Sequence, residues 1–154
     1  MKTVYKILIS LTIGAISTPV FFSLYGIIAN FDVEHHFLRW VFSLPRAYQL
    51  TAGLLHSFAV EMIAAIPVIF IAGIIIGFLV KNKPVFFGLI TVAGFFICET
   101  IYFSIMVEKF GFYHYGSTIW YTLGSIISWI LLFILMTKLG TTIRIKGLKS
   151  DIKT

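Results

Sequence analysis

The sequence predicts an all-α integral membrane protein, a single domain over residues 1–154 built as a four-helix transmembrane bundle. The first observation is composition: 59% of the 154 residues are hydrophobic, only 12% are charged, and the mean hydropathy is +1.00. Soluble domains contain about 25% charged residues, so lipid must cover the apolar surface of this chain. The other two observations are four long apolar runs and the placement of basic residues between them.

The four apolar runs are each long enough to cross a bilayer. They cover residues of about 7–29, 53–80, 85–107 and 119–139. About 20 residues at 1.5 Å per residue span the 30 Å hydrocarbon core. Because lipid offers no hydrogen-bond partner to a free backbone amide, all four runs are expected to be helical.

The basic residues predict the topology. Nine of the twelve lysines and arginines fall on one side of the four expected spans: Lys2, Lys6, Lys81, Lys83, Lys138, Arg144, Lys146, Lys149 and Lys153. The other side has only Arg39, Arg46 and Lys109. The positive-inside rule therefore places both termini in the cytoplasm, and the composition fits a bacterial-type cytoplasmic (inner) membrane. We expect the short basic tail after Leu139 to lie against anionic lipid.

The connections between the runs differ in length. The turn around Lys81 to Pro84 is so short that it predicts an antiparallel hairpin of neighbouring second and third spans. The long connection before the second span has apolar residues at helical spacing, which predicts an amphipathic interfacial helix over about 34–44, ending before Pro45. We expect this helix to cover the outer mouth of the bundle.

Two glutamates lie inside apolar runs, and they are the strongest candidates for function. Glu61 is in the second span and Glu99 in the third, at similar expected depth on helices expected to be neighbours. No lysine or arginine lies at that depth to act as a counter-ion. A charge near the bilayer centre costs on the order of 3 kcal/mol on insertion scales, and intramembrane ionisable residues are functional by default. Two close carboxylates would share a proton or hold a cation. The alternative is a protonated glutamate that only fixes the packing of the helices.

Further polar side chains are expected at the same level, where they line a pocket or simply join helices by hydrogen bonds. The candidates beside the two glutamates are His56, Ser57, Tyr102, Ser125 and Ser128. Gly73 and Gly77 form a GxxxG motif, which permits close approach of helices within the bundle or between protomers. Pro19 and Pro67 are expected to kink the first and second spans.

A metal site has only weak candidates. The four histidines, His35, His36, His56 and His114, are all expected at or near the outer face. His56 and Glu61 are five residues apart and point about 140° away from each other on a helix, unlike the ligands of an HExxH motif. The single cysteine, Cys98, excludes an intrachain disulfide or CxxC redox motif, and we expect no cofactor.

The sequence leaves three function classes open. The first is a non-enzymatic protein of accessory, immunity or sensor type that acts through helix contacts in the membrane and a polar pocket open to the outer side. The second is a small transporter or channel in which Glu61 and Glu99 bind a proton or cation. The third is a membrane-embedded enzyme acting on lipid, and the absence of HExxH, GxSxG and Walker motifs favours no enzyme.

The expected partners follow from the same features. They are the lipid bilayer and either a second membrane protein or further copies of the chain, whereas the basic charge is assigned to topology and not to nucleic acid. In size and topology the chain is similar to the four-span immunity proteins that protect bacteria from pore-forming toxins.

Overall fold

The computed structural model describes residues 3–34, 38–80, 82–110 and 119–151, and in these ranges the chain forms five helices and no strand. The helices are α1 (Thr3–Glu34), α2 (Leu38–Ser43), α3 (Arg46–Leu79), α4 (Pro84–Phe110) and α5 (Ile119–Asp151). Four of them are long and apolar enough to cross a membrane, so the predicted class of multi-pass helical membrane protein is confirmed. The predictions of a cytoplasmic location for both termini and of a helix lying in the interface stay predictions.

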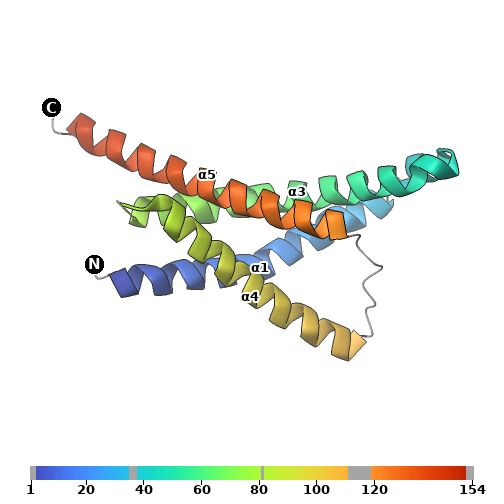
Figure 1. The fold of residues 1–154 in the computed structure, drawn as a ribbon, viewed down its shortest axis with the longest axis horizontal. Coiled ribbons are helices and arrows are strands. Elements are labelled where there is room, and N and C mark those ends of the chain that lie inside the picture. Colours follow the sequence, from blue (N-terminus) through green and yellow to red (C-terminus); the bar gives the residue numbers. More distant parts are fainter. Residues whose placement is uncertain (1–2, 35–37, 81, 111–118, 152–154) are drawn as a thin grey trace.

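The four long helices associate as two pairs. α3 packs mainly against α5, and α1 packs mainly against α4. In Figure 1, α3 and α5 run side by side, whereas α4 crosses α1 and then leads away from the other helices. The start of α1, the end of α5 and the turn between α3 and α4 lie at the same end of the molecule, which is called the inner end below.

The predicted hairpin of neighbouring second and third spans is only partly correct. The turn is short, as expected: Val80 ends α3 in an extended conformation, Lys83 has a φ of 59°, and Pro84 begins α4. Yet α3 and α4 make few contacts with each other. A short turn holds only the ends of two helices together, and α5 occupies the face of α3 that packs most closely.

Helix pair α3/α5 is held together by glycines. A Cβ atom on Gly77 would lie 2.7 Å from Cα of Gly140, and one on Gly140 would lie 2.6 Å from the carbonyl oxygen of Ile74. Gly73 faces Met136 of α5 in the same way. The predicted GxxxG motif is therefore used within the chain, where it lets two backbones approach, and it gives no argument for self-association.

Helices α1 and α4 also cross where glycines, Gly14 and Gly94, let the two backbones approach. A Cβ atom on Gly94 would lie 2.9 Å from Cα of Leu11, and one on Gly14 would lie 2.8 Å from the backbone nitrogen of Phe95. Thr18 adds a hydrogen bond between the two helices, since its hydroxyl donates to the carbonyl oxygen of Phe95 at 3.1 Å.

Several helices extend beyond the predicted apolar runs. α3 begins at Arg46 and is 34 residues long, which at 1.5 Å per residue is about 51 Å and exceeds the hydrocarbon thickness. α5 continues as a helix to Asp151, beyond the expected end of the fourth span at Leu139. That the basic residues after Leu139 lie against anionic lipid stays a prediction. Pro19 and Pro67 both lie inside continuous helices.

The short helix α2 lies against the start of α3. Val41 is buried and contacts Gly53, and the side chain of Gln49 donates hydrogen bonds to the carbonyl oxygens of Phe42 and Leu44. Phe42 itself is exposed. These contacts fix the connection to the second span at the end of the molecule opposite the inner end.

A candidate intramembrane carboxyl site

The candidate site is centred on Glu61, which is half-buried on α3. Two side chains of α5 bind its carboxyl group: the Ser125 hydroxyl and the indole N–H of Trp129 both donate to Oε1, the second at 2.9 Å. Ser125 and Trp129 are four residues apart and therefore share one face of α5. The glutamate thus joins α3 to α5 by charge-assisted hydrogen bonds.

Glu99 lies within electrostatic range of Glu61 although the two helices barely touch. Its side chain is half-buried on α4. The structure therefore brings together the two glutamates that the sequence singled out. Among the residues that the structure describes, no hydrogen-bond donor reaches Glu99.

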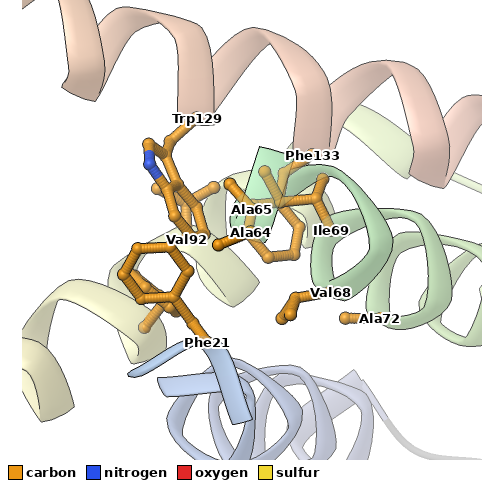
Figure 2. Packing of buried hydrophobic residues seen from close by; sticks show 10 residues of the cluster. Phe21, Ala64, Ala65, Val68, Ile69, Ala72, Val92, Trp129 and Phe133 are labelled. Atoms are coloured by element: carbon orange, nitrogen blue, oxygen red, sulfur yellow. The ribbon is translucent and has the colours of Figure 1, made fainter. Parts of the chain in front are cut away.

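An aromatic layer lies one helical turn from the carboxyl groups toward the inner end. It consists of Phe21 from α1, Phe95 from α4, and Trp129 and Phe133 from α5. Phe95 stacks on Trp129 with ring centroids 4.1 Å apart, and Phe21 packs edge-on against Trp129 at 5.0 Å. Figure 2 shows Phe21, Trp129 and Phe133 converging with the alanines of α3 between the helices.

The aromatic layer is tightly packed on the α3 side as well. Ala64 and Ala65 have no exposed surface, and Trp129 and Phe95 are at most 2% exposed. Phe95 lies one turn below Glu99, and Trp129 lies one turn below Ser125. The layer separates the carboxyl groups from the inner half of the bundle.

Below the aromatic layer, the buried polar groups are hydroxyls used mainly in helix packing. Thr91 and Thr137 donate to carbonyl oxygens one turn earlier in their own helices, and Thr141 donates to Gly77 of α3. Ser10 is the buried side chain in the described part of the chain whose hydroxyl has no partner. No ionisable residue occurs in α3 after Glu61 or in α4 before Cys98.

The other predicted site residues differ in their exposure and in the contacts that they make. Tyr102 lies one turn beyond Glu99 and stacks on Phe22 of α1 at 4.6 Å. Ser128 is half-buried on α5, whereas Ser57 is exposed. His56 is half-buried and takes part in an interaction of its own.

Of the four histidines proposed as metal ligands, the structure describes only His56. His35, His36 and His114 lie outside the described residues, as does most of the outer connection between α4 and α5. In the parts of the helices that are described, no group of three or more histidine, cysteine, aspartate or glutamate side chains could hold a metal ion.

Trp129 is the site residue that the sequence reasoning missed. A signal was present, because Trp129 follows Ser125 by one helical turn and an indole buried in an apolar helix needs an acceptor for its N–H. Glu61 was the available acceptor at that depth.

Comparison of the chain with protein-family models, with curated proteins and with solved structures finds no match. The function is therefore argued from the carboxyl site alone.

Proposed function

We propose that this protein acts without catalysis as a sensor-type membrane protein, in which Glu61 and Glu99 bind a proton from the outer side and thereby change the contacts between helices. The observation that supports it most is the aromatic layer beneath the carboxyl groups. A carboxyl pair closed on its inner side by packed rings suits reversible binding from one side of the membrane. A transport path would need a polar connection to the other side.

The depth of the two carboxyl groups supports access from the outer side. Glu61 lies about 27 Å along α3 from Leu79, and Glu99 about 22 Å along α4 from Pro84, at 1.5 Å per residue. With a hydrocarbon core of about 30 Å, both glutamates fall near the boundary opposite the inner end. The charge pattern of the sequence assigns that boundary to the outside.

A proton fits the site better than a metal ion does. Oε1 of Glu61 already accepts two hydrogen bonds, and among the described residues no group of three or more carboxylate, histidine or cysteine side chains could hold a metal ion. Two neighbouring carboxyl groups in a low-dielectric site avoid double ionisation by sharing one proton.

Loss of that proton would act on α4. With both carboxyl groups ionised, Glu61 and Glu99 repel each other, and α4 makes few contacts with α3 that would oppose their separation. Glu61 is fixed to α5. Raising the outer pH should therefore move the outer part of α4 away from the pair α3/α5, while the glycine crossings at the inner end stay closed.

The test is a pair of spin-label distance measurements in proteoliposomes. Labels at Leu55→Cys on α3 and Ile101→Cys on α4, in a Cys98→Ser background, should separate as the outer pH rises. Labels near the inner end, at Ile75→Cys and Val85→Cys, should keep their distance. The double variant Glu61→Gln/Glu99→Gln should show no pH dependence at either position.

A proton-flux assay tests the alternative that the protein is a transporter. Liposomes containing the wild-type protein should acidify no faster than empty liposomes under an imposed pH gradient. Flux that disappears in the double glutamine variant would show a proton transporter instead, and an outer distance that is unchanged with pH would refute the sensor.

A further inference from the structure

The two carboxyl groups have unequal surroundings. Glu61 receives two donors, and both are directed at the same oxygen, Oε1. The indole N–H of Trp129 can only donate, so the oxygen that it contacts must be an acceptor. Hydrogen bonds from an O–H and an N–H to one carboxylate oxygen stabilise the negative charge there.

The donors to Glu61 are held in place by packing. Trp129 is stacked on Phe95, packed edge-on against Phe21, and 2% exposed, so its ring has no room to turn away. A donor fixed in this way keeps its hydrogen bond whatever happens at the neighbouring helix. Glu61 therefore has fixed hydrogen-bond donors within the α3/α5 pair.

Glu99 has the opposite surroundings. In the described part of the chain no donor reaches its carboxyl group, and its helix makes few contacts with α3. A second anion without donors, half-buried beside the first, is the more expensive of the two to keep ionised.

Among the side chains that the structure describes, few other titratable groups lie at the level of the pair on these helices. They are His56 on α3, Cys98 and Tyr102 on α4, and Tyr25 on α1. α5 has none between Leu123 and Thr137. None of these brings a permanent positive charge to Glu99.

We infer that Glu99 is the group that binds and releases the proton, and that Glu61 stays the fixed carboxylate with Ser125 and Trp129 as its positioning residues. This assignment rests on the proposed function. The titrating group is on α4, which makes few contacts with α3, so protonation is read out as movement of α4 relative to α3. The second carboxyl group, Glu61, is hydrogen-bonded to α5.

The test is infrared difference spectroscopy of the full chain in lipid nanodiscs, titrated over pH. The wild type should show a protonated-carboxyl C=O band that disappears as the pH rises. Glu99→Gln should abolish the titrating band, and Glu61→Gln should retain it. The reverse pattern, with the band lost in Glu61→Gln and kept in Glu99→Gln, would overturn the inference.

A separate double variant tests whether Trp129 positions Glu61. In Glu99→Gln/Trp129→Phe, Glu61 has lost its fixed donor and can take up a proton, so a titrating carboxyl band should return. The matched control is Glu99→Gln/Trp40→Phe, because Trp40 is exposed on α2 and should leave the band absent. A band that stays absent in both double variants would show that Trp129 only packs.

A second measurement does not depend on the folding of the glutamate variants. In Trp40→Phe/Trp120→Phe, the vibrational band of the remaining indole N–H should stay constant through the pH range in which the carboxyl band titrates. A shift of the indole band in step with the carboxyl band would place the proton on Glu61. A wild type without any titrating carboxyl band would refute the proposed function itself, whereas titration on Glu61 refutes only the assignment.

Discussion

The two helix pairs use the same packing device and differ in one addition. In α3/α5 the backbones meet at Gly77 and Gly140, and in α1/α4 they meet at Gly14 and Gly94. Each pair also has a threonine hydroxyl that donates to a carbonyl oxygen of the partner helix. Only α3/α5 adds an ionisable group, Glu61, held by donors of the facing helix.

The comparison shows that the charged group is not needed to build a helix pair of this kind. α1/α4 associates through close backbone contact, one threonine hydrogen bond and aromatic packing such as Phe22 on Tyr102. In lipid, association depends on such packing and on interhelical hydrogen bonds, since burial from water supplies no driving force. The glutamate in α3/α5 is thus an addition to a pair that glycines already hold, which is the arrangement expected of a functional group.

The largest effect is expected at the glycine crossings. Gly77→Ala should lower the stability of the bundle by about 3 kcal/mol, the upper end for overpacking, because the new Cβ would lie 2.7 Å from Cα of Gly140 and 2.7 Å from the nitrogen of Thr141. Gly94→Ala should behave similarly in α1/α4. The measurement is unfolding by SDS titration in bicelles.

Two other glycines serve as matched controls. A Cβ atom on Gly124 in α5 or on Gly26 in α1 would meet nothing within 4 Å. Gly124→Ala and Gly26→Ala should therefore change stability by no more than about 0.5 kcal/mol. Equal losses at all four positions would mean that the effect comes from the backbone of each helix and not from the crossings.

These crossings also show what the sequence could and could not predict. Gly73 and Gly77 were identifiable because two glycines spaced by four residues are a known packing pattern, but the pattern does not specify its partner. The second crossing was missed, although Ser10, Gly14 and Thr18 form a stripe of small residues at the same spacing. A stripe with one glycine is a weaker signal than a GxxxG motif.

The pairing of helices was the harder part to predict. The length of the turn after Val80 indicated that α3 and α4 are neighbours, yet a turn fixes the distance between helix ends only. α3 selects α5 because its glycine face meets Gly140, a contact between residues more than sixty positions apart. Glu61 and Glu99 could be placed at similar depth from residue counting, whereas the donors to Glu61 depend on the register of α5 against α3.

The second-largest effect on stability is expected at the hydrogen bond between Trp129 and Glu61, the carboxyl group that joins α3 to α5. Trp129→Phe keeps an aromatic ring but removes the donor to Glu61, and it should lower stability by about 1.5 kcal/mol, as for a hydrogen bond to a charged group. Trp40→Phe, on exposed α2, is the control and should have no measurable effect. In Glu61→Gln, Trp129→Phe should have a smaller effect, and additive losses would show that the indole and the carboxyl group are not coupled.

A smaller effect is expected for the polar contact of α1/α4. Thr18→Val removes the hydroxyl that donates to the carbonyl oxygen of Phe95 and retains the shape of the side chain. Hydrogen bonds between membrane helices contribute about 0.6 kcal/mol on average, and the loss should be of this size. Thr12→Val, at an exposed position of the same helix, should leave the unfolding curve in place. If Thr18→Val lowers stability as much as Trp129→Phe does, the polar contacts of the two helix pairs do not differ in strength.

The smallest effect is expected at the inner end of α3/α5, where Arg144 of α5 donates to the carbonyl oxygen of Phe78 in the last turn of α3. A cation near the carbonyl groups that end a helix contributes about 0.5 kcal/mol when it is partly exposed, and salt screens it. Arg144→Gln should therefore lower stability slightly at low ionic strength and not at high ionic strength. Lys146→Gln, two residues further along α5 and exposed, removes the same charge without that contact and should have no effect at either ionic strength. If the two variants behave alike, the contact of Arg144 adds no stability, and glycine packing alone holds the inner end of α3/α5. Glu61 would then be the one charged group that distinguishes the two pairs in the described part of the chain.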